Sequence, residues 1–366
     1  MITRKANKGE LENIIKIANK SFATVRYENY NFKQTIPYIY NSKKDYSDIH
    51  YVCENERKEI IAVGGNLIRK INIDNNIYFF SNIGTISTLP EFRNQGFMSE
   101  LMKNFDQENI NKEIVFSILT GDRKRYLHYG FEKSIYSCII KLSPKFFNNQ
   151  DVFTIDQIQT SYQINKIFEI YRQNVKLLLR NKNNFIEQLK SRKHNIYILK
   201  NKKEIIGYFS INRQQDCIDE FYLKSLSYLK DSISSILSYF DWKILKIFIN
   251  LMDTEYFTET KKYAEELRFY NDINIKVYDI KKFVEFAFYC TKKVKNFKNS
   301  IYFFKIDNKN YKIKIKNNNI DITEGNFKTN KNFTSIEFID YILNPINFFE
   351  DNKLNFVLDF NYPDLF

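Results

Sequence analysis

Residues 93–98 combine the residue types that bind an anion. Arg93 supplies a positive charge, and Gly96 lets the backbone approach a phosphate closely. The unpaired amides and the dipole of a first helical turn also attract negative charge. Such a helix is predicted directly after the turn, because apolar residues recur at helical spacing at Met98, Leu101, Met102 and Phe105. The pattern predicts a phosphate site, with a plain strand–loop–helix connection as the alternative on spacing alone.

Two predicted strands position this turn. The β-branched run at residues 83–88 predicts a strand, which ends before Pro90 because proline cannot donate to a sheet ladder. A second strand is predicted at residues 114–119, and an aromatic segment follows at residues 126–131. Six of the nine glycines fall within residues 64–130, so special backbone geometry is expected there, including a bulge or a tight backbone approach at residues 64–65.

Residues 88–102 resemble the acetyl-CoA motif of the GNAT N-acetyltransferase superfamily. Arg93 and Gly96 occupy the positions of its R/Q-x-x-G-x-G/A pattern, and Met98 departs from the pattern where glycine or alanine is usual. Residues 126–131 are similar to the aromatic-plus-glycine ending of the same family. The resemblance implies an enzyme that takes acetyl-CoA as cosubstrate, uses no metal, and transfers the acetyl group to a primary amine.

The resemblance also implies two sets of cofactor contacts. In the first set, backbone amides polarise the thioester carbonyl, and these are the amides of Ile86, Ser87 and Thr88. In the second set, the turn and the first helical residues hold the pyrophosphate, and these are Arg93, Asn94, Gln95, Gly96, Phe97 and Met98.

Tyr126 is the predicted general acid, because its offset from Gly130 resembles that of the family's catalytic tyrosine. A phenol with a pKa near 10 stays protonated at neutral pH and can donate its proton to a departing thiolate. Tyr129 is the second candidate, and His128 is interpreted as a surface residue on the same turn. The alternative is that Tyr126 only packs in a core.

The overall composition fits a multidomain cytoplasmic protein. The chain has 366 residues, 43% of them hydrophobic, which exceeds one ordinary domain and is enough for buried cores. Its net charge of +13 could attract nucleic acid, but the basic residues are scattered, which argues against that partner. The four cysteines form no Cys-x-x-Cys pair, which favours reduced thiols over a disulfide framework or a zinc site. We expect no membrane span, because no apolar run is long enough.

Three domains are predicted, with a fold class of α/β and α+β. Residues 1–145 form a GNAT catalytic domain, and residues 146–272 repeat its strand–turn–strand pattern without an R-x-x-G turn, so they form a degenerate GNAT-like domain. Residues 273–366 form a compact α+β module, in which Val277 opens a strand and residues 355–360 form the last one. This order resembles the Eis (enhanced intracellular survival) acetyltransferases, which end in a sterol-carrier-like domain.

The Eis resemblance implies a second catalytic group, the C-terminal carboxylate of Phe366, as general base. Leu365 stands where a penultimate acidic residue would help to hold a cationic substrate, and Asp364 is the candidate replacement. The expected acceptor is a polycationic small molecule, such as an aminoglycoside, or a protein lysine, and a homo-oligomer is left open. The alternative from another class is a non-enzymatic protein whose third domain binds a lipid or a partner.

Overall fold

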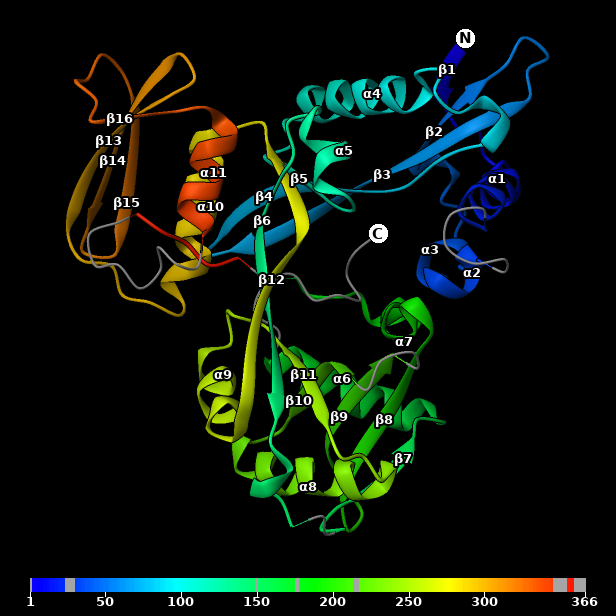
Figure 1. Ribbon diagram of the computed structural model, residues 1–366, viewed down its shortest axis with the longest axis vertical. Coiled ribbons are helices and arrows are strands. Elements are labelled where there is room, and N and C mark those ends of the chain that lie inside the picture. Colours follow the sequence, from blue (N-terminus) through cyan, green and yellow to red (C-terminus); the bar gives the residue numbers. More distant parts are fainter. Residues whose placement is uncertain are drawn as a thin grey trace.

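The computed structural model describes residues 2–23, 30–148, 151–174, 178–212, 217–344 and 354–358. Within these residues, a mixed sheet of 12 strands runs through most of the molecule, in the order β1-β2-β3-β4-β5-β12-β6-β11-β10-β9-β8-β7. A separate sheet of four strands has the order β15-β14-β13-β16. We call the described residues of segments 2–142, 154–260 and 264–358 the first, second and third lobes (Figure 1).

The first lobe alternates strands and helices around β4 and β5. Its elements are β1 (Ile2–Lys5), α1 (Leu11–Ala23), α2 (Phe32–Thr35), α3 (Pro37–Tyr40), β2 (His50–Glu54), β3 (Ile60–Ile73), β4 (Asn76–Thr88), α4 (Phe97–Asn111), β5 (Phe116–Thr120), α5 (Arg123–Leu127) and β6 (Glu132–Leu142). The β3–β4 hairpin turns at Asp74 and Asn75, which both have positive φ, as short polar residues in tight turns do.

β4 and β5 are parallel neighbours for only a short stretch. Residues 80–82 of β4 pair with residues 116–118 of β5, and no pairing between the two strands is described beyond them. A parallel pair needs a crossover, and α4 supplies it with Leu101, Met102 and Phe105 buried against the sheet. The two strands therefore leave a gap in the sheet beside the beginning of α4.

The second lobe repeats this arrangement. Its elements are β7 (Thr154–Gln157), α6 (Ser161–Asn174), α7 (Phe185–Leu189), the 3₁₀ turn η5 (Ser191–Lys193), β8 (His194–Asn201), β9 (Glu204–Asn212), β10 (Cys217–Leu223), η6 (Leu226–Tyr228), α8 (Leu229–Phe240), β11 (Leu245–Ile249) and α9 (Thr254–Thr260). β8, β9 and β10 are antiparallel, and β10 is parallel to β11 at Cys217 and Ile218 only.

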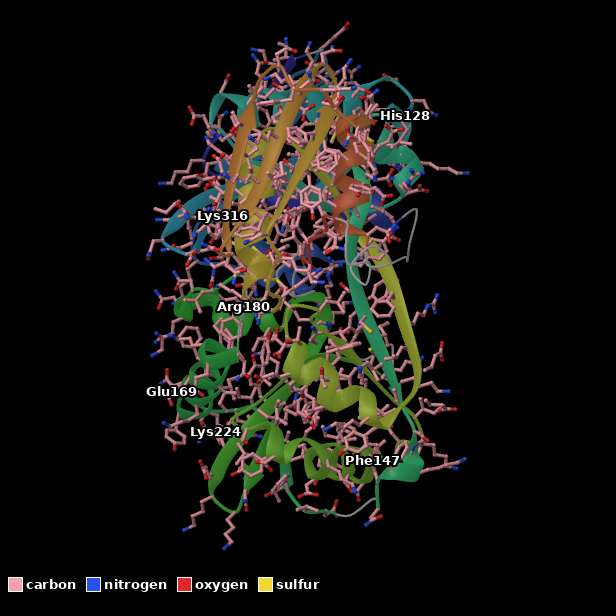
Figure 2. All side chains as sticks on the ribbon, turned by 90° about the vertical axis from the view of Figure 1, so that its left-hand side faces the viewer. His128, Phe147, Glu169, Arg180, Lys224 and Lys316 are labelled. Carbon is pink, nitrogen blue, oxygen red and sulfur yellow. The ribbon has the colours of Figure 1, made fainter. Side chains whose placement is uncertain are left out.

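The third lobe begins with a strand of the large sheet and continues as a small α+β layer. Its elements are β12 (Ala264–Val277), α10 (Ile280–Lys292), β13 (Ser300–Ile306), β14 (Lys309–Lys316), β15 (Asn319–Glu324), β16 (Lys331–Phe333) and α11 (Ser335–Leu343). α11 begins with a capping box, in which Thr334 accepts from the Glu337 amide and the Glu337 side chain accepts from the Thr334 amide. Figure 2 shows the small sheet lying over the first lobe.

The expectation for Val277 was wrong. This residue ends β12 instead of opening a strand of a separate domain. Residues 273–277 of β12 pair with β5, and most of β12 also pairs with β6, so the expected boundary between residues 272 and 273 falls inside one strand. Strand pairing over such a distance in sequence decides the role of β12, and local patterns do not encode it.

The prediction of a strand at residues 355–360 was also wrong for residues 355–358, which the structure describes. Residues 355–358 have no strand assignment, and residues 359–360 lie outside the described ranges. The alternating apolar pattern is real, because Phe356 and Leu358 are buried, but the backbone has other partners. The Val357 amide donates to Thr291 Oγ1 at 2.9 Å, and the Phe356 amide donates to the Ile342 carbonyl.

One apolar core joins the third lobe to the first. Phe116 of β5 contacts Phe283 and Phe286 of α10, with ring centroids 5.4 and 5.1 Å apart, and Phe80 of β4 stacks on Phe116. α10 therefore fixes the third lobe behind the gap between β4 and β5.

No helix within the described ranges is both long and apolar enough to cross a membrane.

Candidate active site

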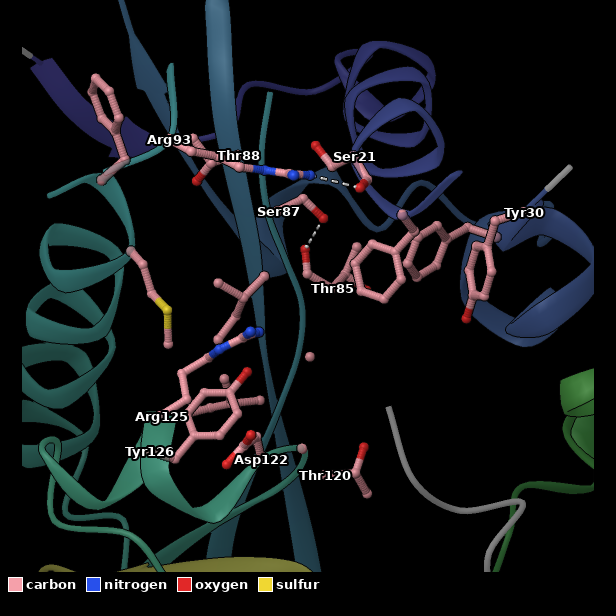
Figure 3. Close-up of a pocket in the computed structure, with 18 of the residues that line it drawn as sticks. Ser21, Tyr30, Thr85, Ser87, Thr88, Arg93, Thr120, Asp122, Arg125 and Tyr126 are labelled. Carbon is pink, nitrogen blue, oxygen red and sulfur yellow. Dashed lines mark hydrogen bonds between the residues drawn. The ribbon is translucent and has the colours of Figure 1, made fainter. Parts of the chain in front are cut away.

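A cleft of about 620 Å³ opens where β4 and β5 diverge. Its walls come from residues 83–88 of β4, the turn before α4, residues 120–122 after β5, α5 and the α1–α2 region. Arg192 reaches it from η5 of the second lobe. Figure 3 shows the side chains from these elements converging on one space.

A β-bulge shapes the β4 wall opposite Gly64, one of the two glycines where the sequence predicted a bulge or a tight backbone approach. Thr85 and Ile86 of β4 stand opposite the single residue Gly64 of β3. A Cβ atom at Gly64 would come within 2.8 Å of the Phe105 ring, so a larger residue would push α4 away from the sheet. The bulge thus needs both an extra residue on β4 and a glycine on β3.

The bulge holds Thr85 in a strained backbone conformation. Its φ of 57° is left-handed, which costs a β-branched residue on the order of 1–3 kcal/mol. The Tyr40 hydroxyl lies 2.6 Å from Thr85 Oγ1 and 2.9 Å from His50 Nε2. His50 Nδ1 donates to the Tyr46 carbonyl at 2.9 Å. This buried chain of hydrogen bonds stabilises the strained residue from behind the cleft.

His50 is neutral in this arrangement. Burial lowers the pKa of its ring to about 4, so the imidazole carries no charge at neutral pH. Burial likewise raises the pKa of the Tyr40 phenol above its ordinary value, so this group keeps its proton. The cleft wall at Thr85 is therefore supported by uncharged groups.

The three residues predicted to polarise the thioester carbonyl all line the cleft. Ile86, Ser87 and Thr88 follow the bulge, on the part of β4 for which no pairing with β5 is described. The Ser87 hydroxyl donates to the Thr85 carbonyl at 3.0 Å, which fixes the backbone next to the bulge. The Leu89 amide donates to the Ile61 carbonyl of β3, and successive amides of a strand alternate in direction. The Ser87 amide therefore also faces β3, and the Thr88 amide faces the gap, where it can donate to a ligand.

The beginning of α4 has the features of an anion site. Its N-cap is Gly96, with φ of 84° and no side-chain cap on the first turn. No atom lies within 4 Å of the position a Cβ of Gly96 would occupy, so the space beside the helix start is open. These observations fit a bound pyrophosphate. Of the predicted contacts, Arg93, Asn94, Gly96, Phe97 and Met98 line the cleft, and Gln95 is exposed on the same turn.

Arg93 is tied to the first helix. Its Nη2 atom donates to the carbonyl of Ser21, at the end of α1, at 2.9 Å (Figure 3). This hydrogen bond holds the guanidinium beside the helix start, where its charge adds to that of the α4 dipole.

Tyr126 lies on α5, with only 8% of its surface exposed, and it lines the cleft. Figure 3 shows its hydroxyl pointing into the cleft beside Arg125. The ring packs on Gly121, where a Cβ would stand 2.5 Å from it. Tyr129, by contrast, is not a lining residue, and its hydroxyl lies 2.8 Å from Ser99 Oγ on α4. His128 is exposed.

Sequence reasoning missed several lining residues. Phe22, Tyr30 and Phe32 form an aromatic cluster, with ring centroids 5.0–5.1 Å apart, on the wall opposite α4. Arg125 stands next to Tyr126 in sequence and could have been found from that neighbourhood. Arg192 gave no local signal, because its place depends on packing between lobes. Phe366, the predicted base, lies outside the described residues.

The comparisons with known proteins bear on this cleft. Residues 3–134 match the model of the acetyltransferase (GNAT) domain. This matched segment contributes nearly all of the cleft wall, and the chain carries the GNAT domain of an acyltransferase enzyme. No curated protein matches the chain. Within the described residues, no group of three or more His, Cys, Asp and Glu side chains could hold a metal ion.

Several solved structures share the fold over most of the chain. A GCN5-related N-acetyltransferase from Anabaena variabilis has a TM-score of 0.65 at 14% identity, covering 94% of this chain and 90% of its own. Eis1 from Mycobacterium abscessus has a TM-score of 0.63 at 7% identity, with the same coverage. A probable N-acyltransferase from Enterococcus faecalis has a TM-score of 0.62 at 14% identity, covering 89% and 85%. At such low identity these neighbours show the fold alone.

Proposed function

We propose that this protein transfers the acetyl group of acetyl-CoA to a primary amine. The observation that carries the proposal is a convergence: the uncapped start of α4, the bulged end of β4 and the Tyr126 phenol all face one cleft. A pyrophosphate at α4 would direct the pantetheine arm along the gap between β4 and β5, which brings the thioester toward Tyr126.

The residues divide the chemistry between them. The Thr88 amide donates a hydrogen bond to the thioester oxygen as the amine nitrogen attacks the carbonyl carbon. The C–N bond forms, the C–S bond breaks, and Tyr126 gives its proton to the departing thiolate. Arg93 and the amides around Gly96 bind the pyrophosphate. The amine loses its proton to a general base.

For that base we propose the C-terminal carboxylate of Phe366, on the resemblance to the Eis acetyltransferases. A single glycine added after Phe366 converts the carboxylate into an amide, which cannot accept the proton. Turnover should then be lost, while acetyl-CoA affinity and melting temperature stay unchanged. Normal turnover in the extended protein would mean that the base lies elsewhere in the cleft.

The wider proposal is an Eis-like arrangement of three domains, with the catalytic domain at 1–145, a degenerate middle domain, and a sterol-carrier-like third domain that begins with β12 and not at residue 273. The likeness of fold to Eis1 over 94% of this chain supports it. The alternative, a lipid- or partner-binding protein without enzymatic activity, is less well supported, because Phe304, Ile313 and Phe338 of the small layer pack in the core shared with β4 and β5. That packing gives the third lobe the role of a scaffold for the first.

The test of the proposed function has two parts. Purified protein should bind acetyl-CoA with micromolar affinity by calorimetry, and it should release free thiol when acetyl-CoA and an amine are both present. The acceptors expected from sequence, a polycationic small molecule and a lysine peptide, belong in the first screen. A folded protein that does not bind acetyl-CoA would exclude the enzymatic proposal in favour of the binding protein.

A further inference from the structure

Arg192 brings a positive charge to the cleft from the second lobe. It lies in η5, which packs beside α2 of the first lobe. It lines both the cleft and a neighbouring hollow of about 740 Å³, and the two spaces share residues 120–122 at the end of β5. Arg192 therefore stands where the cleft opens into the hollow, on the side away from the helix start at Gly96.

The turn that carries Arg192 has an unusual backbone. Arg192 and Lys193 have φ of 57° and 63°, two consecutive left-handed residues without a glycine. Such a conformation is unfavourable for L-residues and persists only where the surrounding packing enforces it. The packing between the lobes thus holds Arg192 at the mouth of the cleft at a cost in backbone energy.

The described residues that line the cleft are more basic than acidic. They include three arginines, Arg93, Arg125 and Arg192, against one carboxylate, Asp122. The hollow has the same balance, with Arg123, Lys124, Lys133 and Arg192 against Asp122 and Asp272. The chain as a whole carries a formal charge of +13. At the mouth, where Arg192 stands, these cations favour an anionic group on the acceptor over a further cation.

The cations serve different parts of the cleft. Arg93 is bonded to the Ser21 carbonyl, at the side where the pyrophosphate fits. Arg192 comes from the other lobe and stands at the far mouth. The wall formed by Phe22, Tyr30 and Phe32 is aromatic, with the Phe32 ring set edge to face against the other two. An arginine next to an aromatic wall suits a flat apolar molecule that ends in a carboxylate.

We propose that the acceptor is a primary amine with a flat apolar body and a distal carboxylate, which Arg192 binds. This proposal rests on the proposed acetyltransferase function and narrows its substrate class. It departs from the polycationic acceptor expected from sequence. Arg192 acts as a specificity-determining residue: binding of the carboxylate at the mouth orients the amine toward the thioester, and the transfer chemistry stays as described above.

The experiment compares acceptors that differ only in charge. 4-(2-Aminoethyl)benzoate and 2-phenylethylamine share the amine and the ring, and only the first has a carboxylate. Spermine serves as the polycation. Thiol release at saturating acetyl-CoA gives kcat/KM for each amine with the wild type, Arg192→Gln and Arg192→Lys. Lys190→Gln is the matched control, because Lys190 is exposed beside the same turn and does not line the cleft.

The wild type should prefer the benzoate over phenylethylamine by at least tenfold, and spermine should be the poorest acceptor. Arg192→Gln should remove most of this preference, Arg192→Lys should keep part of it, and Lys190→Gln should leave it within twofold. Acetyl-CoA affinity and melting temperature should not change.

Three results would overturn the proposal. These are a preference for spermine, no preference between the two ring amines, or an equal loss on all amines in Arg192→Gln, which would show that Arg192 supports catalysis and not acceptor choice. Each of these leaves acetyl-CoA binding and transfer intact, so the proposed function survives. Absence of acetyl-CoA binding in the wild type would instead remove the proposed function and, with it, this inference.

Discussion

The first and second lobes build the same strand pattern, but among the residues that the structure describes a cofactor-sized cleft opens at the point of divergence of the first. In both lobes antiparallel strands lead to a short parallel pair, three residues long between β4 and β5 and two between β10 and β11. A helix follows each central strand, α4 in the first lobe and α8 in the second. The difference must therefore lie in the side chains.

The two helix starts differ in charge. α4 begins at Gly96 after Arg93, whereas α8 has Tyr228 as its N-cap, and the basic residue before it, Lys224, is paired with Glu204. A hollow of about 470 Å³ near Leu226, before α8, is lined by two glutamates of α9, Glu255 and Glu259. Glu259 is paired with Lys262, and the Glu255 carboxylate disfavours a phosphate in this hollow.

The two central strands differ as well. Both strands have a register shift, at Thr85 in β4 and between Ile218 and Glu220 in β10, but the one in β4 has the strained residue, because Thr85 has a positive φ. In the second lobe Glu220 of β10 accepts from Arg180 at 2.9 and 2.6 Å and from the Tyr208 hydroxyl at 2.6 Å. The Arg180 and Glu220 side chains are 0% and 2% exposed. The central strand of the first lobe therefore lines a cleft, whereas that of the second lobe carries a buried ion pair.

The largest effect is expected from Tyr126→Phe in the first lobe. Loss of a general acid typically lowers the rate by about 10²–10⁴-fold, and the ring still packs on Gly121. Turnover should fall by that factor while acetyl-CoA affinity is kept. Tyr129→Phe is the control, and full activity in Tyr126→Phe with loss in Tyr129→Phe would assign the acid to Tyr129.

Breaking the ion pair should have the next largest effect, on stability alone. Glu220→Leu leaves the buried Arg180 without its carboxylate, which costs about 3–5 kcal/mol. The melting temperature should drop strongly, and the folded protein should still bind acetyl-CoA with normal affinity. The double variant Arg180→Met/Glu220→Leu should regain most of the loss. An affinity change in the single variant would mean that the second lobe contributes to cofactor binding.

Low pH should reduce the stability that the buried, neutral His50 gives to the bulge at Thr85. The pKa of His50 is about 4 in the folded protein, below its value of about 6.5 in the unfolded chain. The unfolded state therefore binds more protons between these values, so this stabilisation is complete above about pH 6.5 and is lost as the pH falls toward 4. Between pH 7 and 4.5 the free energy of unfolding should decrease less for His50→Gln than for the wild type, by on the order of 2 kcal/mol. Melting curves recorded across this pH range measure the difference. Parallel curves for the two proteins would contradict this assignment.

The smallest effect is expected on acetyl-CoA affinity, from matched substitutions at the two helix starts. Gly96→Asp places a carboxylate at the start of α4 and a side chain in a left-handed position, so acetyl-CoA affinity should fall by at least tenfold. Tyr228→Asp, the equivalent change at α8, should leave the affinity unchanged. Titration calorimetry measures both. Equal affinity in wild type and Gly96→Asp would move the cofactor away from this helix.

Local patterns were sufficient for the elements that carry the cleft. The apolar stripe from Met98 predicted α4, and the paired glycines predicted special backbone geometry at Gly64, which stands opposite the bulge of β4. Each depends on periodicity or turn chemistry within a few residues. The positions of Tyr126 and of residues 86–88 at the cleft agree with the resemblance, and their catalytic roles stay predictions.

The rest depends on contacts between distant segments. The left-handed conformation of Thr85, a β-branched residue, is enforced by Tyr40, which no pattern near residue 85 could indicate. Arg192 enters the cleft only because η5 packs on α2. β12 lies between β5 and β6. This position brings Asn274 of β12 into contact with Leu119 of β5, which is 155 residues away in the sequence.

The place of β12 has a consequence for how the protein is made. The ribosome finishes the segment that matches the acetyltransferase domain long before it reaches residues 264–277. Until then β5 and β6 each lack the strand that separates them, so a nascent first lobe has unpaired backbone and uncovered phenylalanines such as Phe116. Pairing over so long a separation is slow, and open strand edges are prone to aggregate. The chain should therefore gain its cleft late in synthesis, and a fragment cut after residue 145 should behave as a folding intermediate and not as a small enzyme.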